Sequence, residues 1–239
     1  MNILITGGTS GLGRAIIDEL ASQADNDIFF TYCHNAELAR EIEARYPSSR
    51  GLKADFTDAD SIHELSCQLS EETVDVLIHN AYSGDPVGTH FHKTAPDNFR
   101  TAFEHNIMPF IEITQACLPG MRKRRFGKII TILTSYLIDV PPTGFSVYTA
   151  TKAYLRQLSK SICREYGRYN VVSNCLLPEF MPTGFGHVED FQLDQLKAAH
   201  PLKQLLQPKE VAEVVVSLIR SSQQLNGVEI PINAAQHIM

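Results

Sequence analysis

Short apolar segments alternate with segments of helical periodicity along most of this 239-residue chain. The apolar segments predict strands at residues 3–6, 27–32, 51–54, 74–78, 128–134, 171–177 and 227–232. The periodic segments predict helices at residues 12–23, 36–46, 58–70, 98–118, 147–166 and 208–220, the fourth interrupted near Pro109. Apolar strands that alternate with helices indicate a parallel sheet covered on both faces.

This order of elements predicts a Rossmann-type doubly wound α/β fold with a mostly or wholly parallel sheet of about seven strands, because crossovers between parallel strands are right-handed. No linker, repeat or low-complexity segment divides the chain, so we expect one domain over residues 1–239. Residues 82–96 and 179–207 have no strong pattern. Long irregular segments often cover active sites, and we expect a substrate loop around residues 179–207.

The net charge of −6 argues against nucleic acid or an anionic membrane as a partner, because both require a basic face. No apolar run approaches the ~20 residues of a membrane span. The five cysteines form no Cys-x-x-Cys pair, so we expect no disulfide framework and a reducing, cytoplasmic setting. The histidines form no zinc pattern, and no metal is expected.

A glycine-rich turn follows the first predicted strand, with the sequence Thr-Gly-Gly-Thr-Ser-Gly-Leu-Gly over residues 6–13. Glycines allow a tight turn and a close approach of the backbone to a ligand. The start of the following helix offers unpaired N–H groups and partial positive charge, which suit a pyrophosphate. The alternative is a strand-to-helix turn that binds nothing.

Tyr148 and Lys152 lie four residues apart in a predicted helix, so their side chains leave the same face one turn apart. A free phenol ionises near pH ~10, and a fixed positive charge nearby lowers that pKa. The pair therefore suggests proton transfer to or from an oxygen. Taken alone, the same spacing also fits two side chains that merely share a solvated face.

Together the two motifs resemble the short-chain dehydrogenase/reductase family, which has Thr-Gly-x-x-x-Gly-x-Gly near its N-terminus and Tyr-x-x-x-Lys in its active site. Further matches span residues 3 to about 183: an acidic residue after the third strand, Asn-Ala after the fourth, an asparagine in the long helix, a serine thirteen residues before the tyrosine, and a proline and threonine after the sixth strand. They are Asp55, Asn80, Ala81, Asn106, Ser135, Pro178 and Thr183.

The resemblance implies hydride transfer between a nicotinamide cofactor and a carbonyl or alcohol carbon. It implies Tyr148 as general acid and base, Lys152 beside the nicotinamide ribose, Ser135 on the substrate oxygen and Asn106 on a water. The implied cofactor contacts are Gly7, Thr9, Ser10, Gly11, Leu12, Gly13, His34, Asp55, Phe56, Asn80, Ala81, Tyr148, Lys152, Pro178 and Thr183. It also implies homodimers or homotetramers that pair through residues 98–118 and 147–166.

NADP(H) is the predicted cofactor, with NAD as the alternative. Tyr32 stands at the end of the second strand, where relatives specific for NAD tend to carry an aspartate. A carboxylate there would bind the ribose hydroxyls of NAD and repel a 2′-phosphate. His34 and Asn35 follow, and either side chain is able to bond a phosphate; Arg14 is a further possible contact.

The chain also departs from the family pattern. Tyr82 replaces a glycine at the floor of the cofactor cleft, and Glu179 replaces the glycine after Pro178. The expected pocket is mostly apolar, with His90, His92 and Glu179 as polar contacts; its apolar members are Leu137, Ile138, Val140, Phe145, Phe180, Met181 and Phe185. This lining suits a small or medium ketone or a β-keto intermediate, although the same residues are equally compatible with core or oligomer contacts.

Other interpretations remain open at this stage. Ser135 fits an ordinary hydroxyl at a strand end, Asn106 a backbone contact in a distorted helix, and Asp55 a turn before Asp58. A catalytically silent nucleotide-binding regulatory or scaffold protein would keep the same fold. So would a lyase or epimerase that uses the nicotinamide transiently.

Overall fold

Seven parallel strands form one sheet in the order β3-β2-β1-β4-β5-β6-β7. The computed structural model describes residues 1–239 except 24, 87, 186–188 and 239. The strands are β1 (Asn2–Ile5), β2 (Asp27–Tyr32), β3 (Ser49–Lys53), β4 (Val76–His79), β5 (Gly127–Ile132), β6 (Val171–Pro178) and β7 (Glu229–Ile232). The strand order reverses between β1 and β4, which is where such sheets bind ligands. The predicted doubly wound parallel sheet is confirmed.

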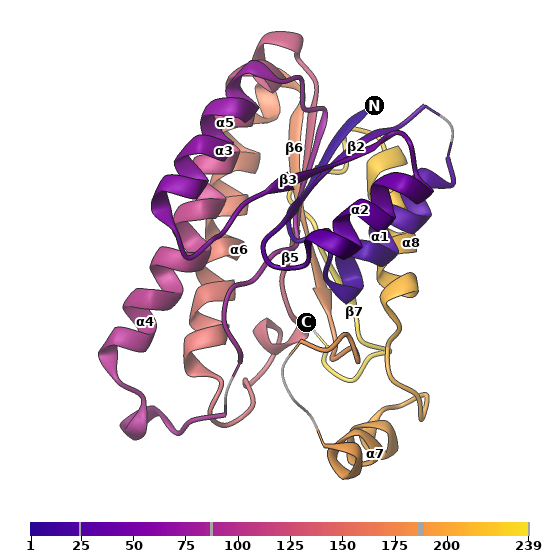
Figure 1. The fold of residues 1–239 in the computed structure, drawn as a ribbon. Coiled ribbons are helices and arrows are strands. Elements are labelled where there is room, and N and C mark those ends of the chain that lie inside the picture. Colours follow the sequence, from indigo (N-terminus) through magenta and orange to yellow (C-terminus); the bar gives the residue numbers. More distant parts are fainter. Residues whose placement is uncertain (24, 87, 186–188, 239) are drawn as a thin grey trace.

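Helices cover both faces of this sheet, as Figure 1 shows. One layer holds α1 (Gly11–Ala21), α2 (Ala36–Arg45) and α8 (Pro208–Arg220), and the other holds α3 (Ala59–Glu71), α5 (Met108–Arg124) and α6 (Ser146–Tyr166). Ile16 and Ile17 of α1 are buried in one apolar cluster with Val215 of α8. Ile113 of α5 and Leu65 of α3 belong to a second cluster on the opposite face. Burial of these apolar stripes holds the helices to the sheet.

A helix that the sequence pattern did not predict lies in residues 179–207. It is α7 (Asp190–Ala199), which begins with a capping box formed by Glu189 and Gln192. None of its residues is buried. Without a buried face the segment has no apolar stripe, which is the signal that sequence periodicity detects.

The predicted helix over residues 98–118 is in fact three consecutive pieces. They are α4 (Pro96–Ala102), a π-helical turn (Phe103–Ile107) and α5, which begins immediately before Pro109. A proline lacks the N–H of the regular ladder and its ring collides with the carbonyl four residues earlier, here that of His105. The irregularity therefore lies just before Pro109, over residues 103–107.

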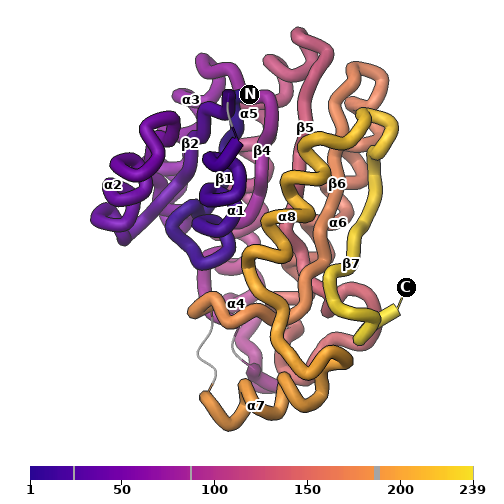
Figure 2. The backbone as a smooth tube through the Cα atoms, turned by 90° about the vertical axis from the view of Figure 1, so that its right-hand side faces the viewer, coloured from indigo at the N-terminus to yellow at the C-terminus, as the bar shows by residue number. Residues whose placement is uncertain are grey.

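The carboxyl ends of the strands meet at one edge of the sheet, which we call the carboxyl edge. The glycine-rich turn follows β1, Asn80 follows β4, a short 3₁₀ turn (Ser135–Leu137) follows β5, and Glu179 follows β6. Helix α7 and the C-terminal residues after β7 lie at the same edge (Figures 1 and 2). None of the helices in the described residues has the length and apolar character needed to cross a membrane.

Candidate active site

The glycine-rich turn forms a tight loop between β1 and α1. Gly7 has a φ of +69°, which favours glycine over residues with a side chain. Ser10 caps α1 by accepting a hydrogen bond at its Oγ from the Gly13 amide (3.0 Å). A Cβ at Gly13 would lie only 2.2 Å from the Gly7 carbonyl oxygen. The turn is thus closed on itself through Gly7 and Gly13, and its shape depends on both.

The end of β4 holds this turn in place. Asn80 donates from Nδ2 to the carbonyl oxygens of Thr6 (3.0 Å) and Gly7 (3.2 Å) and to the Oγ of Ser10 (3.1 Å). The Thr6 hydroxyl oxygen accepts from the amides of Asn80 and Ala81 (both 3.0 Å). Two predicted cofactor-binding segments, far apart in sequence, are therefore hydrogen-bonded to one another.

The first turn of α1 is suited to an anionic group. The Gly13 amide is capped by Ser10, whereas the amides of Gly11 and Leu12, which precede it, have no hydrogen bond within the described residues. A Cβ at Gly11 would lie 2.9 Å from the Cβ of Thr183, which is too close for an ordinary contact. The segment after β6 therefore crosses the start of α1 at this glycine. The free amides and the helix dipole fit a dinucleotide pyrophosphate. Thr9 lies in the same turn.

Gly13→Ala is expected to weaken NADPH binding by more than about tenfold and to lower the melting temperature, because the new methyl group collides with backbone rather than with a movable side chain. Gly88→Ala is the control, since its Cβ would meet only the Phe145 ring at 3.9 Å. Fluorescence titration and thermal unfolding measure both effects. Unchanged binding in Gly13→Ala would show that the turn holds no cofactor.

The predicted adenine end is polar and partly occupied by local contacts. Asp55 accepts at Oδ1 from the amide (2.9 Å) and hydroxyl (2.7 Å) of Thr57, and these bonds lower the pKa of Asp55. Burial, and then the charge of Asp55, raise the pKa of Cys33. Asn35 caps α2 by accepting from the Leu38 amide (3.0 Å). His34 is exposed beside this group and Phe56 packs partly into the second apolar cluster.

Tyr148 lies in the first turn of α6, largely buried. Burial raises the pKa of its phenol, and the nearby Thr134 hydroxyl offsets this only in part. The pKa in this structure is therefore above that of a free tyrosine, whereas the sequence analysis expected a lowered value. The phenol is protonated at neutral pH, as an ordinary tyrosine is, and burial makes it hold that proton more tightly than a free phenol does.

Lys152 lies one turn further along α6 and is buried. Its ammonium donates to the Ile132 carbonyl oxygen at the end of β5 (2.8 Å). Burial lowers the pKa of Lys152 to about 8. Its Nζ is 5.8 Å from the centre of the Tyr148 ring. The structure thus brings the two predicted residues together, and desolvation rather than their mutual attraction dominates the electrostatics of each.

Tyr82, one of the departures from the family pattern, covers this pair. Its ring centre is 5.3 Å from Lys152 Nζ and 5.1 Å from the Tyr148 ring, which it meets edge to face. Phe185 adds a ring 5.6 Å from Tyr82 and 6.2 Å from Tyr148. Burial raises the pKa of Tyr82 to about 12, despite a nearby Thr151 hydroxyl. An aromatic cluster therefore encloses the phenol and the ammonium.

Asn106 lies in the π-helical turn and uses its side chain on backbone. Its Oδ1 accepts from the Ser83 amide (2.7 Å), and its Nδ2 donates to the carbonyl oxygens of Ser83 (3.1 Å) and Ala102 (3.0 Å). These contacts are those of the backbone-binding alternative raised in the sequence analysis. They fix the first residues of the loop after β4, next to Tyr82.

Ser135 is fully buried and donates from Oγ to Oε2 of Glu179 at 2.6 Å. The same carboxylate oxygen lies 3.7 Å from Nε2 of His237, near the C-terminus. The negative charge of Glu179 also contributes, after burial, to raising the pKa of Tyr136. Glu179 thus links the predicted catalytic serine to the C-terminal segment. Pro178 is the last residue of β6, directly before it.

Comparison with known proteins identifies the family of this chain. The family model described as Enoyl-(Acyl carrier protein) reductase matches residues 7–234. A structure described as a short chain dehydrogenase/reductase family protein is 28% identical, covers 98% of this chain and 96% of that one, and superposes with a TM-score of 0.83. The chain belongs to the short-chain dehydrogenase/reductase family. As a member of this family, it is an NAD(P)-dependent oxidoreductase.

Relatives within this short-chain dehydrogenase/reductase family include two 3-oxoacyl-(acyl-carrier-protein) reductases. The Haemophilus influenzae protein is 29% identical and the Aquifex aeolicus protein 30% identical, and each match covers 90% of this chain and 88% of the relative. A Burkholderia cenocepacia short chain dehydrogenase, solved in complex with NADP, has a TM-score of 0.84 at 23% identity and covers 98% of this chain and 96% of its own. At that identity the likeness concerns the fold.

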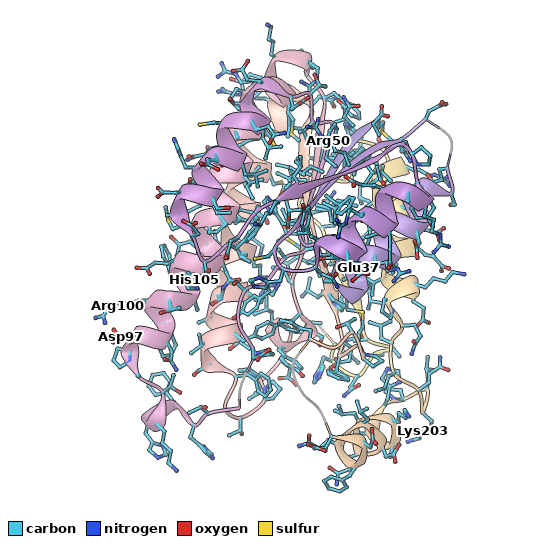
Figure 3. All side chains as sticks on the ribbon, in the orientation of Figure 1. Glu37, Arg50, Asp97, Arg100, His105 and Lys203 are labelled. Atoms are coloured by element: carbon cyan, nitrogen blue, oxygen red, sulfur yellow. The ribbon has the colours of Figure 1, made fainter. Side chains whose placement is uncertain are left out.

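A cavity of about 260 Å³ opens beside Tyr148 in this short-chain dehydrogenase/reductase. Its walls come from the segment after β4, from α4 and from the segment before α6, and include Tyr82, Asp85, Asn98, His105, Phe145 and Tyr148. In the view of Figure 3, His105 lies above the ion pair formed by Asp97 and Arg100 of α4. Of the predicted apolar lining, Phe145 borders this cavity, whereas Leu137 and Ile138 pack against the core and Val140 is 80% exposed.

Three neighbours of the site were not predicted from the sequence: Thr134 beside the phenol, Thr151 beside Tyr82, and His237 beside Glu179. Thr134 directly precedes Ser135 and Thr151 directly precedes Lys152, so proximity along the chain was a usable signal for both. His237 lies far from the motifs in sequence, and no local pattern marks it.

Proposed function

We propose that this chain interconverts a carbonyl and an alcohol by hydride transfer, with NADP(H) as its preferred cofactor. The observation that carries the proposal is the pairing of Tyr148 with the buried Lys152, at the same edge of the sheet as a glycine-rich turn with free amides. Residues 1–239 would form a single dinucleotide-binding and catalytic domain, with the substrate loop around residues 179–207.

Four residues of the chain would have separate roles in this reaction. Tyr148, whose phenol is protonated at neutral pH, would donate its proton to the oxygen of the substrate carbonyl. Lys152 would supply positive charge to the same region and hold hydroxyl groups of the cofactor. Ser135 would orient the substrate oxygen. Asn106, hydrogen-bonded to Ser83, would hold the loop that follows β4. We also propose that Asn106 contacts a water in the active site.

The nicotinamide cofactor would supply the hydride. The free amides of Gly11 and Leu12 at the start of α1 would hold its pyrophosphate, with Asn80 and Ala81 fixing the turn. Tyr32, Cys33 and His34 place no carboxylate directly after β2. Asp55 directs its oxygens to Thr57. The NADP complex of a short chain dehydrogenase with the same fold supports the choice of NADP.

The test is turnover of a panel of ketones and β-keto esters and thioesters, with NADPH and NADH compared at equal concentration. We expect reduction of at least one class of panel member, with the higher kcat/KM for NADPH. A strong preference for NADH would overturn the cofactor assignment. Size-exclusion chromatography with light scattering would test the homodimer or homotetramer expected of the family.

A catalytically silent nucleotide-binding protein is the second candidate. Tyr82 over Lys152 favours it, because the ammonium already has an aromatic partner. A relative that is 26% identical over 94% of this chain is named an inactive hydroxysteroid dehydrogenase-like protein. NADPH binding without reduction of any panel member would favour this candidate.

Tyr82→Gly is expected to lower the Kd for NADPH by about twofold to thirtyfold. The ring stands over the ammonium that would hold the cofactor, and a cation–π contact of this kind contributes about 0.5–2 kcal/mol that binding must replace. Tyr82→Phe keeps the ring and should bind NADPH like the wild type. Fluorescence titration measures both variants. Weaker binding by Tyr82→Gly would show that the ring supports the cofactor site instead.

A further inference from the structure

Glu179 is held in a fixed position at the carboxyl edge. Its amide donates to the Ile232 carbonyl oxygen at the end of β7 (3.0 Å), which continues the pairing of β6 with β7. The residue is only 9% exposed. The backbone of Glu179 is therefore anchored to the sheet, and the hydrogen bond from Ser135 and burial of the side chain set the position of the carboxylate.

The carboxylate has few partners for a group so deeply buried. Oε2 accepts from Ser135 (2.6 Å) and lies 3.7 Å from His237, whose imidazole is charged only when protonated. Within the described residues, Oε1 accepts no hydrogen bond and no lysine or arginine lies within ion-pair distance of either oxygen. Buried carboxylates are stable when paired with a cation or with several donors. Glu179 therefore retains the capacity to bind a cationic group.

The C-terminal segment closes the outer side of this group. Asn233 folds the segment back by donating from Nδ2 to the His237 carbonyl oxygen (2.7 Å), and the Gln236 amide bonds the Asn233 carbonyl oxygen (2.8 Å). Ala234 and Ala235 take positive φ angles to complete the turn. The imidazole of His237 is thereby brought to the carboxylate, and the polar group made by Ser135, Glu179 and His237 faces Tyr136.

The hydrogen bond to Glu179 also limits what Ser135 is able to do. A serine hydroxyl has a single proton, and in this structure Ser135 donates it to Glu179. While that bond persists, Ser135 has only lone pairs to offer to a substrate. A cationic group that engages Glu179 would release this proton for the carbonyl oxygen, so binding of the cation and orientation of the carbonyl are coupled.

We propose that Glu179 forms a subsite for a positively charged nitrogen on the carbonyl substrate, so that the preferred substrates are amino ketones. The inference rests on the proposed reductase function and narrows its substrate class. The Ser135–Glu179 distance of 2.6 Å, with one hydrogen bond of about 3 Å to each substrate group, limits the separation of the carbonyl oxygen and the nitrogen to roughly 9 Å, which short amino ketones satisfy.

The experiment compares 4-aminobutan-2-one with 4-hydroxybutan-2-one, which differ in the charged group. Each is measured as a competitor of the best ketone of the panel, in the NADPH-loaded full chain, whether or not it is itself reduced. The wild type is expected to bind the amine at least tenfold more tightly. Glu179→Gln keeps an oxygen for Ser135 but removes the charge, and should abolish this preference while leaving the hydroxyl competitor and NADPH binding unchanged.

Asp85→Asn is the matched control, because Asp85 lines the neighbouring cavity and carries the same charge. This variant should keep the wild-type preference for the amine. Glu179→Gly, which removes the Ser135 partner as well, should lose the preference too. Equal loss of affinity for both competitors in Glu179→Gln would assign Glu179 to positioning Ser135 and overturn the subsite.

Two further outcomes would also reject the subsite, each for a different reason. Turnover of panel ketones by a wild type that binds both competitors equally would reject the cation subsite and leave the reductase function standing. Loss of NADP⁺ affinity in Glu179→Gln with an unchanged amine preference would assign the charge to the cofactor. Absence of turnover for every ketone would overturn the reductase function itself.

Discussion

Replacement of Tyr148 by phenylalanine is expected to reduce kcat/KM for carbonyl reduction by about 10³-fold, while the Kd for NADPH changes little. The phenol is the group placed to donate a proton, and general acid–base catalysis of this kind contributes about 10²–10⁴-fold. Phenylalanine keeps the ring that packs against Tyr82, Tyr136 and Phe185, so the surrounding aromatic cluster should persist.

Tyr154→Phe is the control for this substitution, because Tyr154 is on the same helix and 45% exposed. Tyr154→Phe removes a surface hydroxyl and should leave kcat/KM within about twofold of the wild-type value, as surface substitutions usually do. Steady-state kinetics and fluorescence titration measure the two effects separately. Near-normal turnover by Tyr148→Phe would remove Tyr148 from the mechanism.

Lys152→Met is expected to abolish turnover and to change how stability depends on pH. Burial lowers the pKa of Lys152 from 10.5 to about 8, so the folded protein disfavours the protonated form. Below pH 8 the folded state carries the whole of this penalty, on the order of 3 kcal/mol. As the pH rises from about 8 to 10.5 the folded chain loses the proton before the unfolded chain does, and the penalty disappears. Methionine carries no charge, and its contribution does not change with pH.

The free energy of unfolding of Lys152→Met relative to the wild type should therefore be higher at pH 7 than at pH 10, by up to about 3 kcal/mol. Urea unfolding at both pH values measures this difference, and the lost bond to Ile132 affects both values alike. Lys123→Met is the control, because Lys123 is exposed on α5. A relative stability that is the same at both pH values would contradict the lowered pKa.

Much of the fold was predictable because each element has a local signature. Residues Asp27–Tyr32 and Pro208–Arg220 have the predicted bounds, since an apolar run and an amphipathic period mark them. Helix α7 has no buried face and left no such mark. The π-helical turn arises from the collision between the Pro109 ring and the preceding turn, and the pattern indicated an interruption without indicating its form.

The site was predictable where motifs are continuous. The glycine-rich turn and the Tyr148–Lys152 pair are local, and their internal geometry follows from spacing. The contact of Ser135 with Glu179 joins residues 44 positions apart, and that of His237 with Glu179 depends on a turn at the C-terminus. Burial of Tyr148, which outweighs the charge of Lys152, depends on Tyr82 and on the sheet below. Such effects belong to the assembled fold and have no signature in any one segment.

The π-helical turn over Phe103–Ile107 has a consequence for how this chain is able to vary in length. A π turn accommodates one residue more than the α-helical ladder, and one residue corresponds to about 100° of rotation about the helix axis. Helix α4, which carries Asn98 and Thr101 into the cavity, is therefore out of phase with α5, which packs in the core. Deleting a single residue here would turn the cavity wall by about a quarter of a revolution while leaving the core helix in register. Length changes at this one point would thus reshape the cavity beside Tyr148 while the core face of α5 stays in place.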